Sequence, residues 1–216
     1  KRQHITENGI KYIKQDGSVG YYQTVNKTTP VAGDVKYVDR NGDGVVDDND
    51  RDIIGNPNPD FTYGFQTKVS WKSLSLSASF NGVQGRDILN VGNRYNNTPG
   101  TKSNNVTRKA FQNMWTDENP SNLYPKSTFV VQNMVMDRYV EDGSYLRCSD
   151  ITLSYILPAK WTNKIGIKNT SVYASVKNAF VITDYSGYDP EVNSFAFDGL
   201  RPGVDMNSYP TPCLLY

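Results

Sequence analysis

The sequence predicts an all-β fold of long antiparallel strands, and three observations carry this prediction. Apolar and polar residues alternate strictly over two runs within residues 61–82. The same period of two returns twice after residue 143. No stretch approaches the eighteen or so apolar residues that a membrane-spanning helix needs. Because successive side chains leave a strand on opposite sides, a period of two indicates strands with one apolar and one polar face.

Residues 61–82 form the clearest element, a hairpin with its turn at Trp71, Lys72 and Ser73. One face carries the apolar members of the alternation, which are Phe61, Tyr63, Phe65, Val69, Trp71, Leu74, Leu76, Ala78 and Phe80. Each arm has about ten residues, whereas strands of soluble sheets have about five or six. That length lets a tilted strand cross a bilayer. A membrane barrel and a soluble sandwich both remain open from this hairpin alone.

Two further strands follow a polar excursion of about sixty residues, 85–143, that shows no clean alternation. Such a length is unusual in a compact soluble domain but routine for the extracellular loops of outer-membrane barrels. One short helix is predicted there from the helical spacing of Val106, Ala110, Phe111, Met114 and Trp115. Residues 144–157 and 171–182 then alternate again and predict a second hairpin. The remaining residues are rich in turns, and the strand expected after Pro212 is missing.

Near the start of the chain, residues 10–13 and 19–24 show weak strand signals. The clearest candidate for a binding site follows them. Residues 39–50, DRNGDGVVDDND, match a twelve-residue calcium loop with Gly44 at its sharp turn. Oxygen ligands fall at offsets 1, 3, 5, 7, 9 and 12, which are Asp39, Asn41, Asp43, the Val45 carbonyl, Asp47 and Asp50. Asp50 stands where helix-flanked loops usually carry a bidentate Glu, so weaker or altered coordination is expected. A solvated turn without metal is the other interpretation, and calcium is favoured because so many offsets match.

Net charge argues against a nucleic-acid-binding protein, and the placement of the reactive residues argues against an enzyme. The net charge of +1 gives no basic excess for nucleic acid. The sequence does not predict an enzyme, because the one histidine, His4, lies in an irregular start and no Ser, Cys or acid pair has a catalytic setting. Glu141 and Asp142 are better explained as loop charges. Cys148 and Cys213 lack metal spacing and predict two free, inert thiols.

Several segments point together to one family: GDVKYVDRNGDGVVDDND with IIGNPNPDFTYGF, VEDGSYLR with SDITLSYILP, VYASVKNAFVITDYSGYDPEV, and GVDMNSYPTP. In this order they resemble the C-terminal segment of the SusC/RagA family of TonB-linked outer-membrane proteins. The resemblance implies antiparallel strands from the C-terminal part of a 22-stranded transmembrane β-barrel with long extracellular loops. Residues 1–60 would form an extracellular loop region with the calcium-like motif. Residues 61–216 would form the C-terminal barrel strands and loops, with the last strand missing.

The same resemblance implies a TonB-dependent importer in the outer membrane of a Gram-negative, Bacteroidetes-like bacterium. Its partners would be outer-membrane lipid, a SusD-like surface lipoprotein, and TonB acting through a plug domain absent from these residues. Oligosaccharide is the expected cargo, with oligopeptide as second choice. Calcium at residues 39–50 would stiffen an extracellular loop where substrate or the lipoprotein docks. The alternative is a soluble calcium-dependent carbohydrate-binding β-sheet protein.

Overall fold

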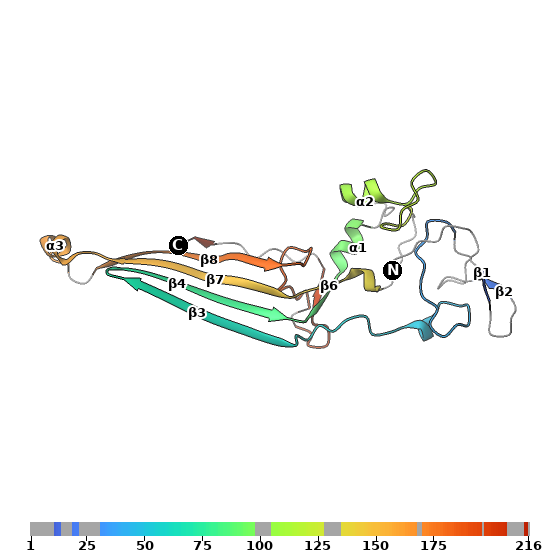
Figure 1. The fold of residues 1–216 in the computed structure, drawn as a ribbon, viewed down its shortest axis with the longest axis horizontal. Coiled ribbons are helices and arrows are strands. Elements are labelled where there is room, and N and C mark those ends of the chain that lie inside the picture. Colours follow the sequence, from blue (N-terminus) through green and yellow to red (C-terminus); the bar gives the residue numbers. More distant parts are fainter. Residues whose placement is uncertain are drawn as a thin grey trace. The chain divides into compact units, whose positions relative to one another are not determined.

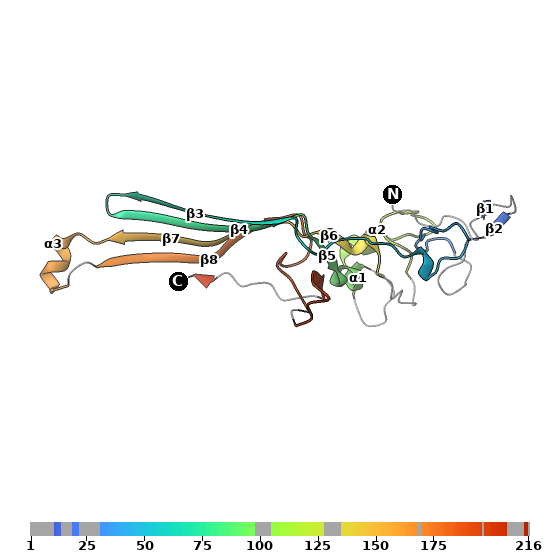
Figure 2. The same cartoon turned by 90° about the horizontal axis from the view of Figure 1, so that it is seen from below.

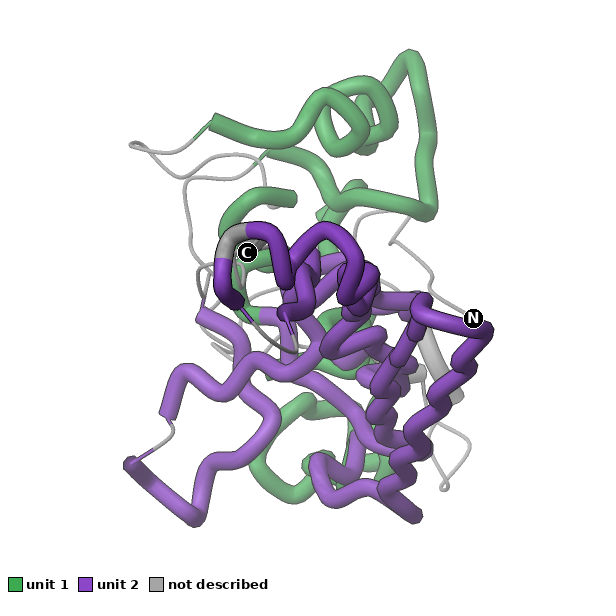
Figure 3. Tube along the Cα trace, turned by 90° about the vertical axis from the view of Figure 1, so that its left-hand side faces the viewer, with its two compact units in different colours: residues 1–54, 91–139 green, residues 55–90, 140–216 purple. Residues whose placement is uncertain are grey.

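The computed structural model describes residues 11–13, 19–21, 31–97, 105–127, 135–167, 170–195, 197–206 and 214–215. The chain divides into two compact units, shown in different colours in Figure 3. Unit 1 contains residues 1–54 and 91–139, and unit 2 contains residues 55–90 and 140–216. Each unit is therefore built from two separate stretches of the sequence.

Unit 2 is dominated by an antiparallel sheet with the strand order β10-β8-β7-β4-β3 (Figures 1 and 2). Its strands are β3 (Phe61–Trp71), β4 (Leu74–Gln84), β7 (Tyr145–Ile156), β8 (Ser171–Thr183) and β10 (Leu214–Leu215). Both predicted hairpins are confirmed as β3–β4 and β7–β8, and β4 pairs with β7 to join them. Apart from the two-residue β10, these strands have 11 to 13 residues.

The strand register places the alternating apolar residues on one side of the sheet, here called the apolar face. Phe65 pairs with Phe80, and their rings stack with centroids 4.6 Å apart. Val69 pairs with Leu76, which pairs in turn with Leu153. Many side chains of this face are exposed, namely Phe61, Phe65, Val69, Trp71, Leu74, Leu76, Leu153, Tyr155, Val172, Phe180 and Ile182. An exposed apolar surface of this extent indicates that another apolar surface or medium covers this face.

Two positive φ angles at residues other than glycine shape this sheet. Lys72 has a φ of 54° and forms, with Ser73, the two-residue turn between β3 and β4. A positive φ at the first of the two turn residues has a twist that suits a hairpin. Asn178 has a φ of 50° and lies where the β7–β8 register shifts between Cys148 and Asp150. This bulge re-aims the side chains that follow it.

A second, three-stranded sheet lies in the loops of unit 2. Its strands are β5 (Asp87–Asn90), β6 (Val140–Asp142) and β9 (Val204–Asp205), in the order β6-β5-β9. Ile88 is fully buried there and forms a core with Tyr185 and Val192. Gly143 permits this packing, since a Cβ at that position would lie 2.6 Å from Ile88. The sequence interpretation treated these segments as irregular, which was wrong, because strands this short show no periodicity.

Unit 1 consists of loops and short elements. These are β1 (Lys11–Ile13), β2 (Val19–Tyr21), η1 (Asp48–Asp50), α1 (Val91–Asn97), α2 (Arg108–Asn113) and η2 (Asp137–Tyr139). β1 and β2 pair as an antiparallel hairpin at the two weak strand signals. α2 confirms the predicted short helix and is capped by Thr107, but Val106, Met114 and Trp115 lie outside it. The helix α1 was not predicted. No helix in the described residues is long and apolar enough to cross a membrane, a finding that does not bear on strands.

The predicted free thiol at Cys148 is present and fully buried, whereas Cys213 lies outside the described residues. We expect Cys148 to resist modification in the folded protein, because a thiol reagent has no access to it. Thiol titration after unfolding without reductant should count both cysteines. Rapid labelling of Cys148 in the native protein, located by mass spectrometry, would contradict this expectation.

Candidate functional site

The acidic loop, residues 39–50, folds back on itself at two glycines. Gly42 and Gly44 have φ angles of 75° and 82°, a region that glycine adopts without steric cost. Their amides donate hydrogen bonds to the Asp39 carboxylate at 2.7 and 2.8 Å. The sharp turn predicted at Gly44 is therefore confirmed.

Asp50 joins the end of this loop to its beginning. Its carboxylate accepts hydrogen bonds from the amides of Arg40 at 2.7 Å and Asp47 at 2.8 Å, and a longer one from Asn41 at 3.4 Å. Burial acts to raise the pKa of Asp50, but the three amide hydrogen bonds outweigh it and hold the pKa below the ordinary value of 3.8. Asp50 is thus ionised at neutral pH and fixes the loop closed.

The six predicted calcium ligands, Asp39, Asn41, Asp43, Val45, Asp47 and Asp50, all lie in this loop but do not surround a common point. Within the described residues, no group of three or more His, Cys, Asp or Glu side chains is arranged to hold a metal ion. Asp43 and Asp47 instead accept hydrogen bonds from the amides of Val45 and Asn49, both at 2.8 Å. Carboxylate and carbonyl oxygens are the ligands that calcium prefers. The donor chemistry therefore fits a hard cation, and the calcium site stays a prediction.

A buried ion pair fastens the segment after β8 to the polar face of the sheet. Arg147 of β7 is 5% exposed, and its Nη2 lies 2.6 Å from Oδ1 of Asp189. Its Nε lies 3.1 Å from Oε2 of Glu191, in an orientation that makes no hydrogen bond. Asp189 is itself buried, and its carboxylate also accepts a hydrogen bond from the Glu191 amide at 2.8 Å. The guanidinium therefore neutralises a carboxylate that has little access to water.

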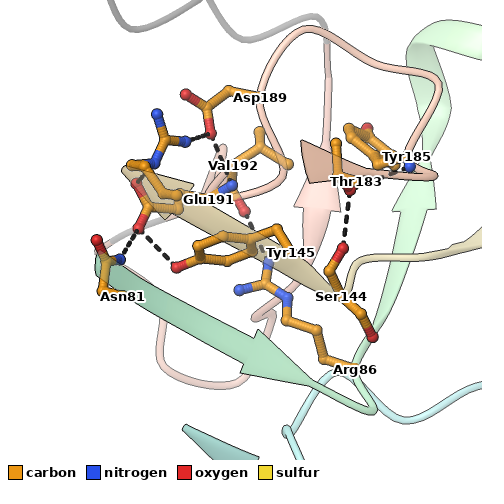
Figure 4. A network of polar contacts seen from close by, with 10 residues as sticks. Asn81, Arg86, Ser144, Tyr145, Thr183, Tyr185, Asp189, Glu191 and Val192 are labelled. Carbon is orange, nitrogen blue, oxygen red and sulfur yellow. Dashed lines mark hydrogen bonds and ion pairs between the residues drawn. The ribbon is translucent and has the colours of Figure 1, made fainter. Parts of the chain in front are cut away.

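Further polar contacts extend this ion pair across neighbouring strands. Figure 4 shows Glu191 pointing toward Tyr145 and Asn81, whose side chains donate hydrogen bonds to Oε1 of Glu191 at 2.6 and 3.3 Å. Arg86 donates to the carbonyl of Val192 at 3.4 Å. The network joins β4, β7 and the loop after β8. It holds chain segments in place, and its residues form no pairing of nucleophile and base.

A second buried contact, between Tyr185 and Asp205, joins the loop after β8 to β9 within unit 2. The Tyr185 hydroxyl donates a hydrogen bond to Oδ2 of Asp205 at 2.6 Å. Burial, and then the hydrogen bond and charge of Asp205, raise the pKa of Tyr185 above its ordinary value of 10.0. Because the folded state favours the neutral phenol, this stabilisation is complete below pH 10 and is lost as the pH rises through the raised pKa.

Replacing Tyr185 with Phe is expected to destabilise the protein by about 1–3 kcal/mol, because the buried Asp205 carboxylate loses a donor. Above pH 10 the unfolding free energy of the variant should also fall less steeply than that of the wild type. Urea unfolding between pH 8 and 11 measures both effects. Tyr188→Phe is the control, since Tyr188 is 71% exposed and the change should stay within about 0.5 kcal/mol. Parallel pH profiles for wild type and Tyr185→Phe would contradict the assignment.

Periodicity did not reveal the residues of these buried contacts. A signal was present, because Arg147 is one of two charges in an alternating run, the other being Asp150, and because Asp189 and Glu191 fall in the segment DYSGYDPEV. Glu141, interpreted from sequence as a loop charge, accepts hydrogen bonds from the amide and hydroxyl of Ser186, both at 2.9 Å. That interpretation was incomplete, since Glu141 lies in β6 and ties it to the loop after β8.

Comparison with known proteins gives related sequences and structures. The chain is 34% identical over 190 residues to TonB-dependent receptor P26 of Formosa agariphila, a match that covers 84% of this chain and 19% of the relative. It is 34% identical over 181 residues to TonB-dependent receptor SusC of Bacteroides thetaiotaomicron, covering 81% and 16%. A solved structure of the RagAB peptide transporter matches with a TM-score of 0.63 and 27% identity, covering 76% and 17%. No protein-family model matches the chain.

The chain spans less than a fifth of the length of these curated relatives. The predicted all-β fold of antiparallel strands is confirmed, since the strands of the described residues are mostly antiparallel, the helices there are few, and the structure resembles that of RagAB. Together with the four sequence segments, these matches identify the chain as a segment of a SusC/RagA-like TonB-dependent receptor.

Proposed function

We propose that this chain is part of a TonB-dependent importer of nutrients in the outer membrane of a Bacteroidetes-like bacterium. The observation that carries the proposal is the exposed apolar face of the sheet formed by β3, β4, β7 and β8. Tilted strands of 11 to 13 residues cross a hydrocarbon core of about 30 Å. The polar face on the other side of this sheet suits the interior of a barrel. The relatives are named as receptors and transporters, which supports a function other than catalysis.

The proposed importer has an orientation and two partners. With the long loops outside the cell, the β3–β4 and β7–β8 turns face the periplasm and the acidic loop faces outward. A SusD-like surface lipoprotein is the partner on the outside, and TonB acts from the inside through a plug domain. Similarity to SusC and to RagAB supports both assignments.

The test of the membrane assignment is electrophoresis of the full-length protein that carries this sequence, in detergent. A closed barrel migrates faster before heating than after it, because the folded barrel stays compact. The alternative, a soluble calcium-dependent carbohydrate-binding β-sheet protein, would stay monodisperse without detergent and show no such shift. That result would overturn the proposal.

The proposed cargo is an oligosaccharide, with an oligopeptide as second choice. Oligosaccharide follows from the family resemblance of the sequence segments. The oligopeptide is favoured by one observation, the similarity to a protein described as a peptide transporter. The purified protein with its lipoprotein partner should be presented with an immobilised glycan library and with a tryptic peptide pool. Binding to glycans supports the first choice, and binding to peptides alone supports the second.

Calcium is the cation we propose for the acidic loop, where it would stiffen an outward-facing segment. Isothermal titration should show uptake with a dissociation constant on the order of 10⁻⁴–10⁻³ M, the range of extracellular calcium modules. The double variant Asp43→Ala/Asp47→Ala should lose this uptake and the calcium-dependent protease resistance of the loop. Asp48→Ala is the matched control, because Asp48 occupies no ligand offset and pairs with Arg51 at the surface.

If the wild type took up no calcium at millimolar concentration, the proposed calcium site would be wrong. If the double variant left both protease resistance and affinity for the lipoprotein unchanged, the stiffening role would be wrong even where calcium binds.

A further inference from the structure

The two turns of the main sheet in unit 2 form a cationic surface, here called the turn end. One is the β3–β4 turn, and the other holds α3 (Ala159–Thr162) and η3 (Asn163–Ile165) between β7 and β8. The turns adjoin each other, because the Ile156 amide donates a hydrogen bond to the Ser73 carbonyl at 2.8 Å (Figures 1 and 2). Among the described residues of the turn end, the exposed charges are Lys72, Lys160 and Lys164.

Acidic residues lie mostly toward the opposite end of the strands, the exception being Asp150, which lies midway along β7 and pairs with Lys177. The sequence has no Asp or Glu in residues 61–86 or 151–183, the stretches that contain both turns. Carboxylates gather instead around the second sheet and its loops, among them Asp60, Asp87, Glu141, Asp184, Asp189 and Asp205. Charge is therefore separated along the strand direction, and of the two ends of the main sheet the turn end is the one that complements an anionic surface.

Each turn also presents an exposed tryptophan beside its lysine. Trp71 is 68% exposed and Trp161 is 63% exposed. The Nζ of Lys72 lies 4.7 Å from the centroid of the Trp71 ring. The apolar face continues to this border, since Trp71 pairs with Leu74 in the last row of the sheet. Indole rings favour the boundary between hydrocarbon and headgroups, where lysines reach toward phosphates.

We propose that the turn end binds anionic phospholipid headgroups, with Lys72, Lys160 and Lys164 on the phosphates and Trp71 and Trp161 at the interface. A protein with an acidic face would match the charges as well. Lipid is favoured because the turn end is continuous with an apolar face that only a bilayer covers along its full length. The inference rests on the proposed function, since it requires the sheet to span a membrane.

Native mass spectrometry of the full-length protein, released from vesicles of equal phosphatidylglycerol and phosphatidylcholine, tests this inference. The measured quantity is the ratio of retained phosphatidylglycerol to phosphatidylcholine. Each charge at an anionic surface strengthens association by about fivefold at low salt. The triple variant Lys72→Gln/Lys160→Gln/Lys164→Gln should therefore lower the ratio strongly, up to about 100-fold at low salt. Added inorganic phosphate should not displace the lipid.

The control removes the same charge at three exposed positions that belong to neither turn, as Lys68→Gln/Arg108→Gln/Lys109→Gln. It should keep the wild-type ratio. A ratio unchanged in the turn variant would overturn the headgroup site while the protein still retained lipid, leaving the membrane assignment intact. Displacement by inorganic phosphate would also overturn it, in favour of a simple anion site. A wild type that retains neither lipid would overturn both the inference and the proposed function.

Discussion

Replacing Arg147 with Met is expected to destabilise the segment after β8 by about 3–5 kcal/mol, the usual cost of leaving one partner of a buried ion pair unpaired. Asp189 is 8% exposed and would keep only the hydrogen bond from the Glu191 amide. Methionine matches the length of the arginine stem, so little packing is lost. Glu191 contributes less to this effect, because its side chain is 40% exposed and water screens its charge.

Hydrogen exchange of the Val192 amide, which donates to the Asp189 carbonyl at 3.3 Å, reports this change locally. A loss of 3–5 kcal/mol corresponds to about 10²–10³-fold or more in protection. Arg201→Met is the matched control, since Arg201 pairs with Asp198 at the surface and both side chains are at least 40% exposed. It should change protection by less than about fivefold.

A double variant separates loss of the ion pair from loss of packing. Arg147→Met/Asp189→Asn removes both charges, so it should be less destabilised than Arg147→Met alone. If the two variants lose equal protection, an unpaired Asp189 carboxylate is not the cause. If Arg147→Met matches Arg201→Met, the buried pair does not fasten the loop.

The main sheet was predictable because its signal is local and long. Eleven alternating residues in β3 and eleven in β4 give both the strand type and the face, and the turn at Lys72 and Ser73 gives the register. The acidic loop was predictable for a similar reason. Its turn at Gly44 and its hydrogen bonds to Asp39 and Asp50 join residues at most ten positions apart.

The second sheet and the buried network were not predictable from pattern. β5 pairs with β6 across about fifty residues and with β9 across more than one hundred. Arg147 meets Asp189 at a separation of 42 residues. A strand of two to four residues is too short to show a period of two. The sequence around a charged loop residue does not indicate which residue it pairs with. These contacts are determined by how the long strands bring their connecting loops together, which only the assembled sheet reveals.

The apolar face predicts a large difference between two neighbouring positions in β3. Thr67 pairs with Ala78 on this face, in a middle row of the sheet, whereas Gln66 pairs with Ser79 on the polar face. Both side chains are exposed. Introducing Arg at residue 67 should cost about 2–4 kcal/mol in a bilayer, because the guanidinium would enter hydrocarbon near the midplane. Introducing Arg at residue 66 should cost little, since that side chain would face the polar interior.

Urea unfolding of the full-length protein in lipid vesicles measures the Thr67→Arg and Gln66→Arg variants under one condition. Both substitutions add the same group to the same strand, so differences in strand propensity and net charge largely cancel. Neither wild-type side chain belongs to a buried ion pair, which leaves the surrounding medium as the main variable. Equal costs would mean that both faces of β3 meet the same environment, as in a soluble sheet, and would remove the physical basis for a membrane-spanning strand.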